Sequence, residues 1–105
     1  MKIVAVTACP SGVAHTYMAA EALKKAGEKL EVEIKVETQG GIGIENVITE
    51  ADLANTDYVV LTKEVAIKNE ERFKGKKIVR VKIADAVKKA EDIVKKLIEH
   101  YNSNN

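Results

Sequence analysis

Four short runs rich in β-branched residues alternate with helix-like segments along this chain of 105 residues. The runs cover residues 2–7, 32–37, 58–62 and 77–83. Because a helical stretch follows each run, successive strands should lie parallel and be joined by right-handed crossovers. This pattern predicts an α/β fold of the three-layer αβα type. In it, a doubly wound, four-stranded parallel sheet lies between two layers of helices.

The order of the strands follows from which runs are apolar on both faces. Residues 3–6 and 59–61 are continuous apolar runs, as is typical of central strands that helices cover on both sides. Residues 32–36 alternate between apolar and charged side chains, and residues 77–83 do so in part, as edge strands do. We therefore expect the sheet order 2-1-3-4, with the first and third strands in the centre.

The helical segments are marked by apolar residues spaced three and four apart. They cover residues 16–30, 50–55 with Thr49 as the expected N-cap, 69–74 as a short turn, and 85–101. The last segment is the clearest, because six apolar residues form one stripe along it: Val87, Ala90, Val94, Leu97, Ile98 and Tyr101.

Composition and charge exclude several classes of function. A net charge of +1, from 17 basic and 16 acidic residues, gives no electrostatic signal for nucleic-acid binding. The single cysteine cannot form an internal disulfide, no apolar stretch approaches the roughly 20 residues that span a bilayer, and no residue cluster has metal-ligand spacing. We expect a cytoplasmic protein without a cofactor, with one domain over residues 1–101 and a frayed tail over residues 102–105.

Cys9 lies just past the first strand, which is where the predicted sheet order reverses. Ligand sites of doubly wound folds lie at this point, outside the carboxyl ends of the strands. The backbone N–H groups of a strand-to-helix loop and the start of the helix dipole stabilise negative charge there, which favours the nucleophilic thiolate and a bound phosphate. The alternative is that Cys9 is only a small buried hydrophobe.

The segment that follows the cysteine has the composition of an anion-binding loop. Its residues are small or polar: Pro10, Ser11, Gly12, Val13, Ala14, His15 and Thr16. The spacing Cys-x5-His resembles the Cys-x5-Arg phosphate loop of tyrosine phosphatases and arsenate reductases, but this segment has no Arg or Lys. Attack of water on a phosphocysteine is then less assisted, which favours an intermediate that persists until another acceptor arrives. Alternatively, His15 is only an exposed first-turn residue and Thr16 only a helix cap.

A second glycine-rich segment, residues 38–46, follows the second strand and emerges at the same edge of the sheet. Gln39 and Gly40 are candidate rim residues of the anion site. The alternative is a flexible loop that leads into the next helix. Glu64 is a weaker candidate for the rim, and Tyr17 and Met18 form either an apolar partner surface or part of the core.

Residues 4–16, read as a unit, resemble the active-site region of the fructose-family IIB component of the bacterial phosphoenolpyruvate-dependent sugar phosphotransferase system. The family loop usually reads Cys-Pro-Thr-Gly, so Ser11 replaces a threonine and keeps the hydroxyl. Residues 18–23, 35–40 and 72–76 continue the match. The resemblance therefore covers nearly the whole chain.

The resemblance implies a phosphotransferase component that works through a phosphocysteine at Cys9. In the family, a phosphohistidine of the IIA component passes its phosphoryl group to the cysteine thiolate, and the phosphocysteine donates it to a sugar in the membrane IIC component. Residues 10–16 match the family's phosphate-binding segment. Fructose is the expected sugar, with mannose derivatives as the alternative. IIA and IIC are expected on other chains, and IIC would bring this chain transiently to the inner face of the membrane.

Three other functions remain open on the residues alone. A low-molecular-weight cysteine phosphatase or arsenate reductase would turn over an aryl phosphate, although the missing loop arginine argues against it. A flavodoxin-type binding module would hold a cofactor phosphate in the same loop. A thiol redox sensor would need a resolving cysteine, which a chain with Cys9 alone lacks.

Overall fold

Strand β1 lies in the centre of a single five-stranded sheet whose order is β3-β2-β1-β4-β5. The computed structural model describes residues 1–9 and 13–103. The strands are β1 (Lys2–Ala8), β2 (Glu33–Gly40), β3 (Gly43–Glu45), β4 (Tyr58–Thr62) and β5 (Ile78–Val81). The four long strands are parallel and follow the predicted order, with β1 and β4 inside it.

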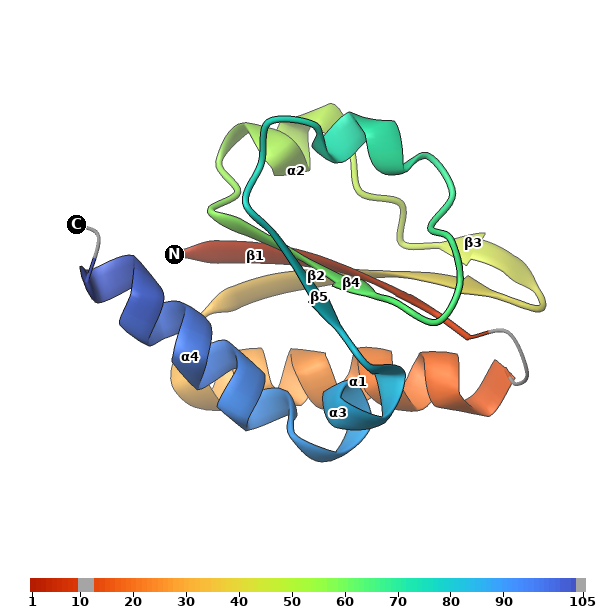
Figure 1. Ribbon diagram of the computed structural model, residues 1–105, viewed down its shortest axis with the longest axis horizontal. Coiled ribbons are helices and arrows are strands. Elements are labelled where there is room, and N and C mark those ends of the chain that lie inside the picture. Colours follow the sequence, from red (N-terminus) through yellow and green to blue (C-terminus); the bar gives the residue numbers. More distant parts are fainter. Residues whose placement is uncertain (10–12, 104–105) are drawn as a thin grey trace.

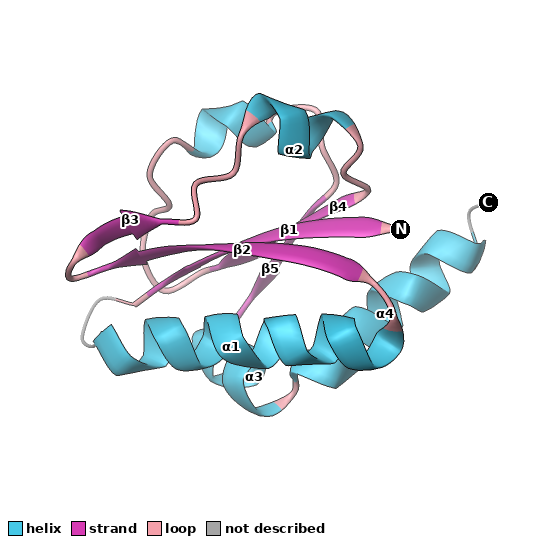
Figure 2. Ribbon diagram, turned by 180° about the vertical axis from the view of Figure 1, so that it is seen from behind, coloured by secondary structure: helices cyan, strands magenta, loops and turns pink. Residues whose placement is uncertain are grey.

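The prediction of a purely parallel, four-stranded sheet is wrong, because β3 adds a fifth strand that pairs antiparallel with β2. The glycine-rich segment makes a hairpin in which Gly40 pairs with Gly43, and Gly43 adopts a φ of +107°, a conformation that favours glycine. The segment is therefore not the open loop that was the alternative. Figure 2 shows this hairpin at the edge of the sheet.

Helices cover both faces of the sheet, as predicted, but unequally (Figures 1 and 2). One face carries α1 (Val13–Leu30), α3 (Ile83–Lys88) and α4 (Ala90–Ser103), and the other carries only α2 (Glu50–Ala54) and the 3-10 helix η1 (Glu70–Phe73). The expected frayed tail, residues 102–105, lies partly outside the described residues. No helix in the described ranges is long and apolar enough to span a membrane.

Two helix predictions need correction. The predicted helix over residues 85–101 is two helices, because Lys89 leaves the helical region (φ −128°, ψ 31°) and the chain changes direction there. Buried residues on both sides of the break, such as Ala86 and Val94, still pack in one core. In addition, α1 begins at Val13 rather than at residue 16, so Thr16 lies inside the helix and does not cap it.

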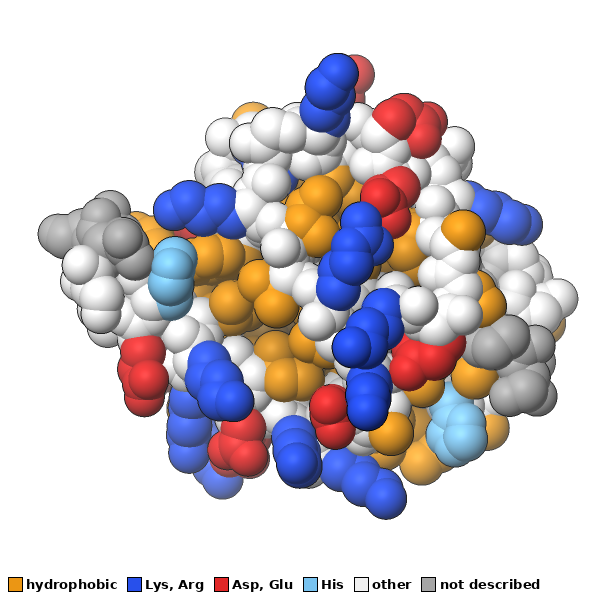
Figure 3. All heavy atoms as spheres, viewed as in Figure 1, with side chains coloured by type: hydrophobic (Ala, Val, Ile, Leu, Met, Phe, Trp, Pro, Cys, Tyr) orange, Lys and Arg blue, Asp and Glu red, His pale blue; other side chains and the backbone are white. Residues whose placement is uncertain are grey.

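Alternate residues of β1 enter the two cores of the domain. Ile3 and Ala5 pack under α1, α3 and α4, whereas Val4 and Val6 pack on the side of α2 and η1, around Phe73. All of them are at most 1% exposed, which is why the strand reads as a continuous apolar run. The surface seen from the β5 side mixes charges of both signs and shows apolar side chains between β5 and α4 (Figure 3).

Helix α2 has the N-cap that the sequence predicts. The Thr49 hydroxyl accepts a hydrogen bond from the Asp52 N–H at 3.2 Å, and the Asp52 carboxylate accepts one from the Thr49 N–H at 2.9 Å. We expect Thr49→Ala to lower the free energy of unfolding by about 1 kcal/mol in urea denaturation, because an N–H at the helix start loses its acceptor. An unchanged free energy of unfolding would contradict this role.

Candidate functional site

Cys9 directly follows β1, at the carboxyl ends of three adjacent parallel strands (Figure 1). It is half-buried and packs against the core on the α1 side. The residue before it, Ala8, pairs with Gln39 of β2. The structure therefore brings Cys9 and the candidate rim residue Gln39 to one edge of the sheet.

Two buried threonines hold the end of β1 in place. Thr62, at the end of β4, accepts a hydrogen bond from the Ala8 N–H at 3.0 Å, and its hydroxyl lies 3.2 Å from the Ala8 carbonyl oxygen. The Thr7 hydroxyl donates to the carbonyl of Thr16 in α1 at 3.0 Å. The backbone that leads into Cys9 is thus fixed to the neighbouring strand and to the helix that follows it.

The Thr62 contacts can be tested by two substitutions. We expect Thr62→Val to destabilise the fold by about 1–3 kcal/mol, because the buried Ala8 N–H loses its acceptor while the side-chain volume barely changes. Thr62→Ser keeps the hydroxyl and should retain most of the stability. Equal free energies of unfolding for the two variants in urea would show that the hydroxyl makes no difference.

The predicted phosphate-binding segment divides into two parts. Pro10, Ser11 and Gly12 lie outside the described residues. Val13 begins α1, Ala14 and His15 are exposed in its first turn, and Thr16 is buried: Val13–Thr16 therefore form the start of an 18-residue helix. The first turn holds no acidic side chain, so nothing in it opposes the positive end of the helix dipole.

A buried ion pair supports the β2 side of this edge. Glu37 is fully buried, and its two carboxylate oxygens accept hydrogen bonds from Arg72 Nη1 at 2.7 Å and Nη2 at 2.6 Å. The Ile48 N–H and the Gln39 amide also donate to it, each at 2.9 Å. Burial alone would raise the pKa of Glu37, but these hydrogen bonds outweigh it and hold the pKa below its usual value.

Sequence reasoning missed this pair. Glu37 continues the polar face of the alternating run in β2, which indicates solvent exposure, yet η1 covers that face and brings Arg72 onto the carboxylate. The only available signal was that both residues lie in segments that continue the family match. These segments, residues 35–40 and 72–76, are far apart in the chain.

Gln39 joins β2 to the loop that follows β4. Its Oε1 accepts from the Lys68 N–H at 2.9 Å, and its Nε2 donates to the Lys68 carbonyl at 3.1 Å. Gly40 lies against Tyr17 of α1, and a Cβ there would come 3.0 Å from the Tyr17 hydroxyl oxygen. Burial, and then the Glu45 carboxylate, raise the pKa of Tyr17.

The remaining candidates fall outside the immediate edge. Both Glu64 oxygens lie 3.1 Å from the Ile83 N–H, so this side chain caps α3. Met18 is 50% exposed on α1, and Ile42, in the turn of the hairpin, is 72% exposed. Within the described residues, no group of three or more His, Cys, Asp or Glu side chains could hold a metal ion.

Comparison with known proteins places this arrangement in a family. A family model described as "PTS system, Lactose/Cellobiose specific IIB subunit" matches residues 4–96. The chain belongs to this IIB family of the sugar phosphotransferase system. This match confirms the IIB part of the resemblance found in the sequence, and the fructose part is confirmed by the curated relatives that follow.

Curated relatives and a solved structure agree with the IIB assignment. The chain is 63% identical over 99 residues to the "PTS system fructose-like EIIB component 2" of Escherichia coli K12, which covers 94% of this chain and 93% of the relative. It is 47% identical to the "PTS system 2-O-alpha-mannosyl-D-glycerate-specific EIIABC component" of the same strain, covering 91% of this chain but 15% of that protein.

The solution structure of the "Enzyme IIB subunit of PTS system from Escherichia coli K12" superposes on this chain with a TM-score of 0.91 at 38% identity. The superposition covers 98% of this chain and 95% of that one. The mixed α/β sheet with helices on both faces is therefore the fold of a IIB subunit.

Proposed function

We propose that this IIB chain is a phosphoryl carrier, in which the Cys9 thiolate accepts a phosphoryl group from a IIA phosphohistidine and passes it to a sugar bound in a membrane IIC component. The position of Cys9 carries the proposal: it follows the central strand at the strand-order reversal and precedes the start of α1. The phosphocarrier domain covers residues 1–101 in this proposal.

The first step moves phosphorus from nitrogen to sulfur. The Cys9 sulfur attacks the phosphorus atom, a P–S bond forms, and the P–N bond to the donor imidazole breaks with its electron pair left on nitrogen. The backbone N–H groups in the first turn of α1, Val13–Thr16, would stabilise the charge on the phosphoryl oxygens. From the preceding segment, Ser11 and Gly12 could add their N–H groups, whereas Pro10 has none.

The second step returns the thiolate. A sugar hydroxyl oxygen attacks phosphorus, the P–S bond breaks, and the hydroxyl proton passes to a base or to solvent. Residues 9–16 contain no arginine that would assist attack by water as the phosphatase loop does. The phosphocysteine therefore survives long enough to meet its acceptor.

We infer that the His15 side chain assists the transfer and does not support the fold. It is exposed in the first turn of α1. We expect His15→Ala to slow phosphorylation of the chain several-fold, while the free energy of unfolding changes by less than about 0.5 kcal/mol. Parallel losses of rate and of melting temperature would contradict this role.

The sugar and the partners are tested by reconstitution. Fructose is the first choice because the relative that is 63% identical is named fructose-like, and a mannose derivative is the second because of the relative that is 47% identical. Membranes with the IIC component, the IIA donor and this chain should form sugar phosphate, and leaving out this chain should stop the reaction. Sugar phosphate formation at an unchanged rate without the chain would contradict the proposal.

A further inference from the structure

A small cavity of about 110 Å³ opens beside the residue that precedes Cys9. The residues that line it include Ala8, Gln39, Gly40, Ile44, Val65 and Lys68, and none of its lining residues is acidic. At about 30 Å³ for each water-sized group, the cavity holds roughly four such groups. A phosphoryl group, with its one phosphorus and three oxygen atoms, fits in such a space.

Lys68 brings the positive charge to this cavity. In the described part of the chain, its ammonium group has no hydrogen bond or ion pair. Among the acidic side chains near it in sequence, Glu64 caps α3 and Glu70 pairs with Arg80 at 2.8 Å, while Glu71 is exposed and forms no ion pair with Lys68. Glu37, near it in space through Gln39, is paired with Arg72. No neighbouring carboxylate therefore neutralises Lys68.

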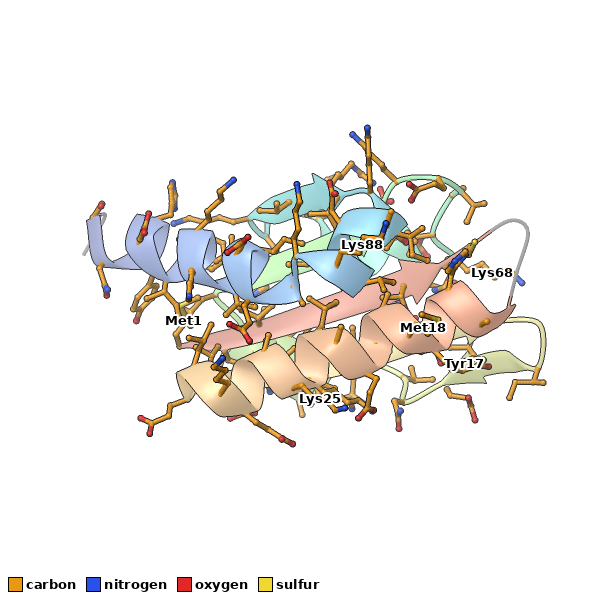
Figure 4. The ribbon with its side chains drawn as sticks, turned by 90° about the horizontal axis from the view of Figure 1, so that it is seen from below. Met1, Tyr17, Met18, Lys25, Lys68 and Lys88 are labelled. Atoms are coloured by element: carbon orange, nitrogen blue, oxygen red, sulfur yellow. The ribbon has the colours of Figure 1, made fainter. Side chains whose placement is uncertain are left out.

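The main chain of Lys68 is held in position. Both its N–H and its carbonyl are bonded to the Gln39 side chain, and Gln39 pairs across the sheet with Ala8. In Figure 4, Lys68 lies at the end of the molecule where α1 begins. The backbone is thus anchored beside Ala8 while the long side chain stays able to reach a ligand.

We propose that Lys68 is a catalytic residue of the phosphoryl site, whose ammonium group binds the oxygens of the phosphoryl group carried by Cys9. This inference rests on the proposed function. A phosphoryl group carries up to about two negative charges, and the cysteine segment, residues 9–16, supplies no lysine or arginine against them. Lys68 supplies that cation from the loop after β4. It exchanges no proton and forms no covalent bond.

The test compares variants for the rate at which a phosphorylated IIA donor phosphorylates Cys9. Lys68→Gln should slow the reaction by about 10- to 100-fold, which is the change in rate expected when one hydrogen bond to a charged group is lost. Lys68→Arg keeps the charge and should retain most of the rate. Lys95→Gln, an exposed residue on α4, removes the same charge elsewhere and should leave the rate unchanged.

A second readout needs no partner protein. Inorganic phosphate should shift the amide NMR resonances of Ala8 and Gly40 in the wild type and in Lys95→Gln, and less in Lys68→Gln. Equal rates for Lys68→Gln and Lys95→Gln would overturn the role of Lys68 and leave the proposed function intact. If wild-type Cys9 does not accept the phosphoryl group from the phosphorylated IIA donor, the proposed function is overturned and this inference with it.

Discussion

Replacing Cys9 by serine is expected to reduce phosphorylation of the chain by a phosphorylated IIA donor by about a thousandfold or more. Serine keeps the size of the side chain and its place after β1. Its hydroxyl, however, is a weak nucleophile, whereas the sulfur of a cysteine is intrinsically very nucleophilic. The substitution therefore removes the nucleophile and leaves the site otherwise intact.

The measurement is the rate at which the intact mass of the chain gains a phosphoryl group. The control is the melting temperature: Cys9 is half-buried, and the change should cost less than about 1 kcal/mol, so the variant stays folded. A folded Cys9→Ser variant that gains the phosphoryl group at the wild-type rate would show that the sulfur is not the acceptor.

Replacing Arg72 by leucine is expected to lower the free energy of unfolding by about 3–5 kcal/mol, because it leaves the fully buried Glu37 carboxylate without its bidentate partner. Urea denaturation measures the loss. The matched control is Arg80→Leu, which breaks a bidentate pair with Glu70 at the surface and should cost at most about 1 kcal/mol. Equal losses in the two variants would contradict the role of the buried pair.

The Glu37 pair also predicts a pH dependence. The pKa of Glu37 is lowered in the folded chain, so its contribution to stability is present above the unfolded-state pKa and is lost as the pH falls through the folded-state pKa. The difference in unfolding free energy between the wild type and Arg72→Leu should therefore narrow as the solution is acidified. A difference that stays constant down to the acid unfolding of the wild type would contradict this assignment.

The arrangement of the four parallel strands could be predicted because burial on both faces leaves a direct trace in the sequence. Residues 3–6 and 59–61 are continuously apolar, and β1 and β4 are indeed central. Strand β3 left no such trace, because three exposed residues carry no periodicity. The break at Lys89 was hidden for a different reason: the apolar spacing continues across it from Ala86 to Val94.

Only those features of the site that depend on residues close together in the sequence could be predicted. The place of Cys9 at the exit of β1 follows from strand order. The start of α1 does not follow from the small residues after Cys9: the sequence predicts residue 16, and the helix begins at Val13. The contacts of Thr62 with Ala8, and of Gln39 with Lys68, depend on register between strands and on the path of a loop. Such contacts between residues distant in sequence have no signature in a single chain.

Peptide-level location of the phosphoryl group tests the carrier mechanism most directly. The wild-type chain is incubated with the phosphorylated IIA donor, digested, and analysed by tandem mass spectrometry, with a second sample alkylated by iodoacetamide beforehand. We expect one phosphorylated site, on Cys9, and no phosphate in the alkylated sample. A phosphoryl group on His15, or undiminished labelling after alkylation, would contradict the mechanism.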